Sequence, residues 1–399
     1  MQNEEGRPLP LKGLKVLDFS HAADGPMCGF MLAAAGADVI KVEPPHGEPY
    51  RKGPATMAFL NANRHKRSLA LNLQNPKGLE IALKLAAGAD ILIESFTPGT
   101  AEAMGIGYQA IDRLNQRIIY CSLSGFGQTG PYSKRPAYDP VIQAMSGFMM
   151  TTGEEGRPPV RVGPGVIGLG TAFIAAYGIL LAVIMREKSG RGQQVDAAFF
   201  DTAVFFLNSF ITGYSLTGLS MPRMGSGNAA FVPYQCFETA DKPVFIGVTQ
   251  NAFWKGFCRA AGMEALENDP RFDSNDKRLA HRKALLAILV PAIREFKSGA
   301  LLARLEAEGV PCAPVQQIPE VIEDPHVRVR QMLYQLEYPG LGKLTVPHIP
   351  LRMSAFKPDE AKRPPLLGEH SVEILLELGY SQEKIDALRR DGIILERPE

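Results

Sequence analysis

The densest short cationic run between residues 1 and 220 is NRHKR, at residues 63–67. Side chains of this kind hold phosphate or carboxylate groups through charge-assisted hydrogen bonds. The whole chain has 43 Lys and Arg against 42 Asp and Glu, so an anion must be bound by a local cluster and not by a general field. A solvated charged loop explains the run equally well. The balanced charge predicts neither a nucleic-acid partner nor adhesion to anionic membranes.

Small residues gather in the segment SHAADGP, at residues 20–26, directly after the first expected strand. They would let a ligand approach the backbone where a strand ends and a helix begins, although tight packing of the helix on the sheet is an equal alternative. Asp24 has two interpretations. It caps the following helix, because Asp suits an N-cap and Pro26 suits the first turn, or it is a carboxylate with a chemical role.

The five cysteines are scattered, with no CxxC pair and no His at zinc spacing, so we expect neither a disulfide framework nor a metal site. We expect a cytoplasmic protein. Its start, MQNEEGRPLP, is polar and lacks the apolar core of a leader. The longest apolar stretch, at residues 172–185, is shorter than a bilayer requires and predicts a buried core helix.

Short β-rich runs alternate with helical runs between residues 14 and 122, which predicts a mostly parallel sheet flanked by helices. Sheets of this kind bind nucleotide-like ligands at the carboxyl ends of their strands. The first strand is not followed by GxGxxG, which disfavours a hydride-transferring enzyme. The expected strands are KVLDFS, DVIKVE, RSLALNL, DILIES, IIYCSLS and QVDAAFF, with helices at about 26–35, 76–87 and 171–186.

The stretch GLSMPRMGSGNAA, at residues 218–230, has the composition of a linker. A second lobe follows it, opening with an expected strand pair in YQCFETADKPVFIGV and containing Trp254 as a core residue. The amphipathic segments near the C-terminus are expected to return to the first lobe. The predicted domains are therefore residues 1–220, a small domain at 221–330, and a C-terminal return at 331–399.

Seven segments, spread over nearly the full length in this order, together resemble the class III CoA-transferases of the formyl-CoA/carnitine-CoA transferase type. They are KVLDFSHAADGP, GADVIKVEPPHGEPYR, NANRHKRSLALNL, FTPGTAEAMGIGYQAI, SLSGFGQTGPYSKRPAYDPVIQAMSGFM, MREKSGRGQQVDAAFFD and LLGEHSVEILLELGYSQEKI.

The resemblance implies an α/β fold, with a Rossmann-like large domain built from both chain ends, a smaller middle domain, and two chains interlocked as a dimer. It implies CoA thioesters as substrate and product, a carboxylic acid as the second substrate, and no other cofactor. Phosphates of CoA need local cations, which favours phosphate contact by the cationic run. The residues expected to bind CoA are His21, Ala22, Ala23, Arg51, Asn63, Arg64, Lys66 and Arg67.

Transferases of this class use an aspartate that attacks the donor thioester, in a segment that reads approximately VPIADLATG before a long helix. The matching segment here is PGVIGLGTA, which places Gly168 at the aspartate position. The run from Arg161 to Met185 contains no carboxylate, so shifting the alignment by one residue restores none. Glycine can neither attack a thioester nor be acylated. The glycines around Gly168 still offer backbone N–H groups that could polarise a carbonyl.

Three functions remain open. The favoured one is a non-catalytic subunit of a heteromeric CoA-transferase, such as one acting on benzylsuccinate-like acids, whose paralogous partner supplies the aspartate. The second is a homodimeric transferase with a relocated carboxylate, for which Asp24 and Asp139 are the candidates. The third is a pseudoenzyme that binds acyl-CoA and regulates or scaffolds.

The residue pair Tyr138 and Asp139 bears on the choice between two enzymes of this superfamily. In the α-methylacyl-CoA racemases a His stands at the position of Tyr138, and a second acid falls at Gly168. Proton abstraction next to a thioester needs a base within reach, so racemase activity is disfavoured. The pair instead matches the YD of the transferases, where the tyrosine contacts the acyl group. As the alternative, both residues anchor the loop through buried hydrogen bonds.

Overall fold

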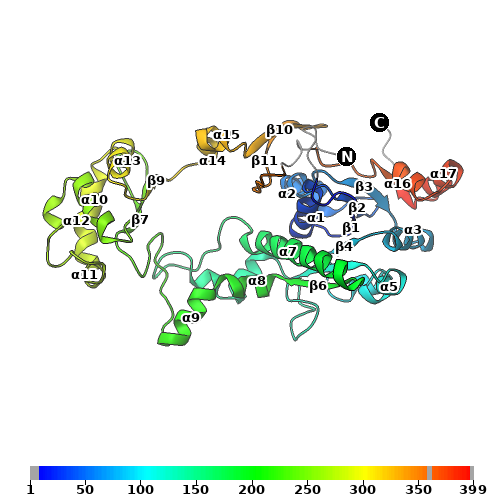
Figure 1. Cartoon of the computed structure of the whole chain (residues 1–399), viewed down its shortest axis with the longest axis horizontal. Coiled ribbons are helices and arrows are strands. Elements are labelled where there is room, and N and C mark those ends of the chain that lie inside the picture. Colours follow the sequence, from blue (N-terminus) through cyan, green and yellow to red (C-terminus); the bar gives the residue numbers. More distant parts are fainter. Residues whose placement is uncertain (1–8, 357–361, 396–399) are drawn as a thin grey trace. The chain divides into compact units, whose positions relative to one another are not determined.

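The structure is a computed structural model that describes residues 9–356 and 362–395. The polar residues 1–8, on which the expectation about a leader rests, lie outside the described part. By its internal contacts the chain divides into two compact units, which we call unit 1 and unit 2 (Figure 1). Unit 1 comprises Met1–Ser146, Val162–Asn208 and His326–Glu399, and unit 2 comprises Gly147–Arg161 and Ser209–Pro325.

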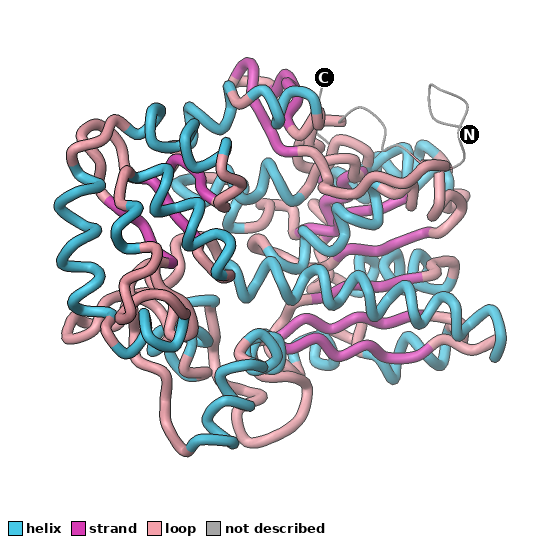
Figure 2. Tube along the Cα trace, turned by 60° about the vertical axis from the view of Figure 1, so that its left-hand side comes forward, coloured by secondary structure: helices cyan, strands magenta, loops and turns pink. Residues whose placement is uncertain are grey.

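The described residues of unit 1 form a seven-stranded sheet in the order β12-β3-β2-β1-β4-β5-β6. Strands β1 to β6 are parallel, and β12 pairs antiparallel with β3. Figure 2 shows these strands side by side, with helices running along them. The expectation of a mostly parallel sheet is confirmed. The strands are β1 (Lys15–Asp18), β2 (Asp38–Glu43), β3 (Arg67–Leu71), β4 (Ile91–Glu94), β5 (Ile119–Ser124), β6 (Gln193–Ala198) and β12 (Ile394–Leu395).

Alternate residues of β1 and β4 enter two separate cores, because successive side chains of a strand point to opposite faces. Leu17 and Leu92 pack in one core, while Val16 and Ile93 pack in the other. Helices α3 (Pro76–Ala87), α5 (Tyr108–Leu114), α16 (Ser371–Glu377) and α17 (Gln382–Arg390) contribute to the first core. Helices α1 (Asp24–Ala34) and α7 (Val166–Ser189) contribute to the second. Burial on both faces explains why a strand such as β4, with the sequence ILIE, carries apolar residues at successive positions.

Local signals set the ends of these helices. The side chain of Asn75 accepts a hydrogen bond from the Lys77 N–H at 2.9 Å and caps α3, and Pro76 occupies the first helical position. Gly190, in the left-handed conformation, ends α7. Unit 1 also contains α2 (Thr56–Ala62), α4 (Thr100–Ala103), α6 (Asp139–Met145), α8 (Phe199–Phe206) and the hairpin of β10 (Leu333–Tyr338) and β11 (Gly342–Pro347).

Helix α7 differs from the expectation in two respects. It is 24 residues long, and among the described helices it alone has the length and composition to cross a membrane. It is also only partly buried, since 44% of its most apolar window is covered within the chain. One face packs on the sheet through Ala172, Ala175 and Ile179, as expected of a core helix. The other face carries exposed apolar side chains, which are Phe173, Ile174, Tyr177, Leu180, Leu181, Ile184 and Met185.

Unit 2 has its own core beside a three-stranded antiparallel sheet, β7-β8-β9, formed by described residues. Trp254 is buried in that core, as predicted. The strands are β7 (Tyr234–Phe237), β8 (Val244–Gly247) and β9 (Cys312–Pro314). The helices of unit 2 are α9 (Asn208–Thr217), α10 (Asn251–Ala261), α11 (Asn275–Ala280), α12 (Arg282–Arg294), α13 (Ser298–Ala307) and α14 (Ile318–Glu323). Helix α15 (Pro325–Val329) begins at the last residue of unit 2 and continues into unit 1.

Candidate active site

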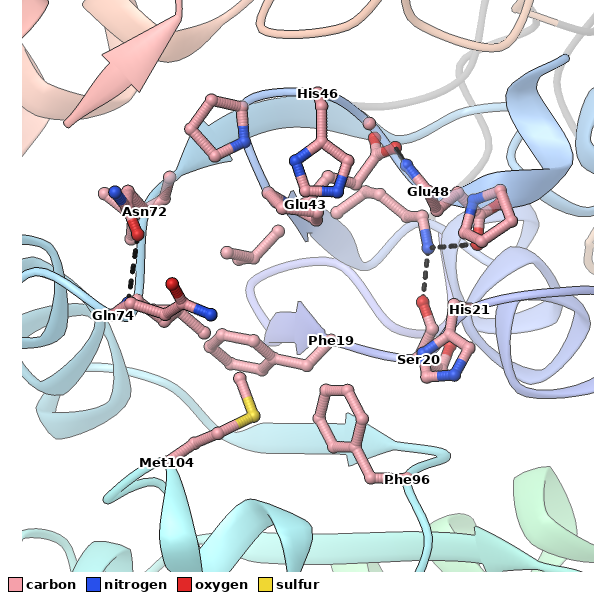
Figure 3. Close-up of a pocket in the computed structure, with 18 of the residues that line it drawn as sticks. Phe19, Ser20, His21, Glu43, His46, Glu48, Asn72, Gln74, Phe96 and Met104 are labelled. Carbon is pink, nitrogen blue, oxygen red and sulfur yellow. Dashed lines mark hydrogen bonds and ion pairs between the residues drawn. The ribbon is translucent and has the colours of Figure 1, made fainter. Parts of the chain in front are cut away.

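A cavity of about 680 Å³ opens at the carboxyl ends of β1, β2 and β3 in unit 1 and reaches residues just past β4. In Figure 3, Phe19, Phe96 and Met104 form its apolar side, and Glu48 and His46 lie across from them. The strand order reverses between β1 and β4, where open parallel sheets bind nucleotide-like ligands. The cavity therefore has the position and the apolar wall that suit a nucleotide-like ligand.

The segment from Ser20 to Ala23 leads from this cavity to helix α1. His21 lines the cavity and donates its backbone N–H to the Ser95 hydroxyl at 3.0 Å. Ala22 has a φ of 69°, which a residue with a side chain rarely adopts, and its N–H donates to a Glu48 carboxylate oxygen at 2.8 Å. Strained backbone of this kind persists only where its surroundings hold it, and it concentrates at functional sites.

A buried ion pair fixes the two elements that this segment joins. Lys66 lies 2.6 Å from Asp18 at the end of β1, and both side chains are fully buried. The ammonium group also donates to the Pro26 carbonyl at 2.7 Å and to the Asn63 side chain at 2.9 Å. Burial raises the pKa of Asp18, but the neighbouring Lys66 and Lys41 more than offset this and lower it overall. The pair thereby ties β1, the first turn of α1 and the residues before β3 together.

Asp24 and Gly168 face each other at the N-terminal ends of α1 and α7. A Cβ atom placed on Gly168 would lie 2.5 Å from the carboxyl carbon of Asp24, which is much closer than real Cβ contacts. The Asp24 carboxyl group thus occupies the space that any side chain at position 168 would need. Glycine inside a helix costs about 1 kcal/mol relative to alanine, and here it leaves room for a carboxylate from another helix.

Asp139, the first residue of α6, lies on the other side of Gly168. One oxygen of its carboxylate accepts the backbone N–H groups of Ile167 and Gly168 at 2.8 and 2.9 Å. The other oxygen accepts a hydrogen bond from the Gln143 side chain. Asp139 therefore satisfies the free N–H groups at the start of α7, where the helix dipole favours a negative charge. Since the Gly168 N–H is already bonded, it does not polarise a carbonyl in this arrangement.

Asp24 has a different environment from Asp139. Helix α1 begins at Asp24 and Ala23 is its N-cap residue, so the Asp24 side chain does not cap the helix. Among the described residues, none donates a hydrogen bond of normal geometry to its carboxylate. Burial, together with the negative charge of Asp139, raises the pKa of Asp24 to about 6. The anionic form of Asp24 is therefore less stabilised than that of Asp139, whose carboxylate accepts three hydrogen bonds.

The comparisons with known proteins decide the family. The model of CoA-transferase family III matches residues 11–371. The chain belongs to CoA-transferase family III. It is an enzyme of the class that moves CoA between an acyl-CoA and a carboxylic acid, as the resemblance implied.

Named relatives of this family III transferase cover nearly all of it. It is 35% identical to human succinyl-CoA:glutarate CoA-transferase, across 98% of this chain and 92% of that protein. It is 37% identical to succinyl-CoA:mesaconate CoA-transferase of Haloarcula marismortui, across 92% of this chain and 96% of that protein. The crystal structure of a CAIB/BAIF family protein from Brucella suis superposes with a TM-score of 0.84 at 35% identity, covering 94% of this chain and all of that one.

The structure brings some residues expected at the transferase site together. Asp24, Asp139 and Gly168 form one cluster, and Ala22 and Ala23 directly precede it. Tyr138 is the N-cap residue of α6, and its side chain is 69% exposed, so it is not a buried anchor of the loop.

The expected CoA-binding cations all have protein partners. Besides the Lys66 pair, Arg51 forms two hydrogen bonds of 2.6 Å with Glu43. Arg64 is buried and donates to the Tyr334 hydroxyl and, at 2.8 Å, to a backbone carbonyl of β11. Arg67 pairs with Asp38, Glu373 and Glu377 at 2.6 to 2.9 Å. These contacts favour structural roles for the four side chains, and their contact with CoA phosphates stays a prediction.

The sequence did not single out several residues that line the cavity. Lys41 is buried there, bonded to the Ser20 carbonyl and 3.8 Å from Glu48, and His46 is exposed. One oxygen of Glu48 is buried without a hydrogen-bond partner among the described residues. Their place in the sequence could have identified them as cavity-lining residues. They stand in or directly after DVIKVE, and the carboxyl end of that strand lies at the ligand-binding edge of the sheet.

Proposed function

We propose that this enzyme transfers CoA from succinyl-CoA to a second short dicarboxylic acid, and that it needs no cofactor besides the CoA thioesters that are its substrate and product. The observation that carries the proposal is the cavity at the β1–β4 edge, one of whose lining residues, His21, stands only three positions before Asp24. A three-residue segment spans at most about 10 Å, so a thioester extending from a nucleotide in the cavity can reach that carboxylate. The named relatives support the substrate class, because both use succinyl-CoA with a dicarboxylic acid.

We further propose that the chain works as a dimer with a second copy of itself. The support is the exposed face of α7, where Phe173, Tyr177, Leu180 and Ile184 recur at helical spacing. An apolar stripe of this length on an isolated soluble chain marks an interaction site. A paralogous partner that supplies an aspartate would cover the same face, but the carboxylate that already fills the space at Gly168 favours the homodimer with a relocated carboxylate.

The test is a CoA-transfer assay on the purified chain with succinyl-CoA and glutarate, mesaconate or oxalate, in which acyl-CoA products are separated and quantified. Omitting the acceptor acid measures simple hydrolysis. We expect the chain alone to form the acceptor's CoA thioester. Transfer only after co-expression with a paralogous subunit would restore the non-catalytic-subunit hypothesis. Binding of succinyl-CoA without transfer in either preparation would indicate the pseudoenzyme and reject the proposed function.

A further inference from the structure

We infer that Asp24 is the nucleophile of this transferase, projecting from the first residue of α1 into the space that a catalytic side chain on α7 would fill. The inference rests on the proposed function and assigns its reacting group. It begins from the packing of two residues that lie 144 positions apart in the chain.

The geometry makes the two positions interdependent. With glycine at 168, the Asp24 carboxyl group lies within 2.5 Å of where a Cβ of residue 168 would be. A side chain at 168 would displace Asp24, and removing Asp24 would leave the space empty. One carboxylate therefore fits between the N-terminal ends of the two helices, and in this chain α1 supplies it. Gly168 and Asp24 therefore depend on each other, because the absence of a side chain at 168 makes room for the carboxylate at 24.

The surroundings select Asp24 over Asp139. The Asp139 carboxylate accepts two backbone N–H groups and a side-chain amide, so most of its acceptor sites are engaged and its position is fixed. Attack on a thioester by Asp139 would break the bonds that satisfy the start of α7. The Asp24 carboxylate has no such bonds within the described residues, and an anion with few hydrogen-bond donors is the better nucleophile. Asp139 acts as a positioning residue, holding the α7 terminus and its negative charge beside Asp24.

The covalent steps balance without an additional reactant. An Asp24 oxygen attacks the thioester carbonyl carbon of succinyl-CoA, the C–S bond breaks, and CoA leaves as a thiolate, giving a mixed anhydride. The thiolate attacks the carbonyl carbon of Asp24 and releases succinate, which leaves an aspartyl-CoA thioester. The acceptor carboxylate attacks that carbonyl and expels the thiolate, forming a second anhydride. The thiolate then attacks the acceptor's acyl carbon, which frees the acceptor-CoA product and restores the Asp24 carboxylate.

The test exchanges the two residues in whichever assembly shows transfer, the chain alone or with its paralogue. We expect Asp24→Ala and Asp24→Asn each to lower kcat by about 10³-fold or more, because loss of a covalent nucleophile has effects of this size. Asp24→Ala combined with Gly168→Asp should regain at least about tenfold over Asp24→Ala, since the carboxylate returns from the opposite helix. The matched control is Asp276→Asn, which removes an exposed carboxylate from the first turn of α11 and should leave kcat unchanged.

Two results separate the inference from the proposed function. Transfer by folded Asp24→Ala or Asp24→Asn at the wild-type rate would overturn Asp24 as the nucleophile and leave the CoA-transferase function intact. A complete absence of transfer in the wild-type assemblies would overturn the proposed function, and the inference with it. Thermal unfolding of each variant shows that a loss of rate is not a loss of fold.

Discussion

The carboxyl group of Asp24 lies where the side chain of residue 168 would begin, 2.5 Å from the position of its Cβ. Two helix N-termini that are distant in sequence thus share one space, which holds a single carboxylate. Asp139 borders the same space and is bound to the backbone of α7.

The first prediction concerns the stability of the protein when residues 24 and 168 are substituted. Gly168→Asp in the wild-type background should lower the free energy of unfolding by about 1–3 kcal/mol, because it overpacks the site and brings two carboxylates together. The same substitution in the Asp24→Ala background should lower the free energy of unfolding much less. Denaturant unfolding of the four proteins gives the coupling energy directly. Equal costs in both backgrounds would show that the two residues do not compete for space.

Asp24→Ala by itself should stabilise the protein at pH 8. The folded-state pKa of about 6 lies above the ordinary value of 3.8, so the ionised group destabilises the fold by at most about 3 kcal/mol. That penalty is fully present above pH 6 and disappears as the pH falls towards 3.8. The advantage of the variant in free energy of unfolding should therefore shrink between pH 7 and pH 4. A difference that is independent of pH would contradict the raised pKa.

The second prediction concerns the pH dependence of the rate. Asp24 must be ionised to attack, so kcat/KM for succinyl-CoA should fall about tenfold per pH unit below pH 6. The Asp24→Ala, Gly168→Asp double variant carries its carboxylate on another helix, so the pH below which its kcat/KM falls should differ from that of the wild type. Initial rates between pH 4.5 and 8 measure both curves. If the two pH profiles coincide, the fall in rate at low pH is caused by the titration of a group other than Asp24.

The third prediction concerns the dimer. Tyr177→Glu together with Ile184→Glu places two charges on the exposed face of α7, where the side chains are 60% and 56% exposed. We expect this variant to lose the dimer in sedimentation velocity, because unpaired charges are costly in an apolar interface. Leu114→Glu, at a leucine of α5 that is 52% exposed, is the control and should stay dimeric. A monomeric wild-type chain would refute the proposed use of this face.

The fourth prediction separates structural cations from binding ones. Lys66→Ala should lower the free energy of unfolding by about 3–5 kcal/mol, because it leaves Asp18 charged and buried. Lys77→Ala removes an exposed ion pair with Asp391 and should cost less than about 1 kcal/mol. Denaturant unfolding compares the two. If Lys66→Ala cost as little as Lys77→Ala while KM for succinyl-CoA rose sharply, phosphate binding would be the main role of Lys66.

The secondary structure of unit 1 was largely predictable from the sequence. The helix at Pro76–Ala87 has the expected bounds because Asn75 and Pro76 mark its start, and the alternating runs became β1 to β6 with shifts of one or two residues. Strand β12 was missed, since its two residues owe their conformation to β3 and not to any pattern of their own. Helix α1 begins at Asp24, two residues earlier than expected, which removed the capping role assigned to that residue.

The site was predictable only in part. Local sequence drew attention to Asp24 and to the absence of a carboxylate at Gly168, but it could not show that the two residues meet. That contact depends on how α1 and α7 pack on the same face of the sheet. The pairing of Arg67 with Glu373 and Glu377 likewise joins residues about 300 positions apart. Charge density in the run at residues 63–67 therefore could not distinguish ligand binding from internal ion pairs.

The most direct test of Asp24 as nucleophile is to map the covalent intermediate on the wild-type protein. The enzyme is incubated with succinyl-CoA, the activated acyl group is trapped with hydroxylamine, and the modified peptide is identified by mass spectrometry. If Asp24 is the nucleophile, a hydroxamate forms on Asp24 and none forms on Asp139 or Asp276. A hydroxamate on any other residue, or full transfer activity with no modification of Asp24, would contradict that assignment.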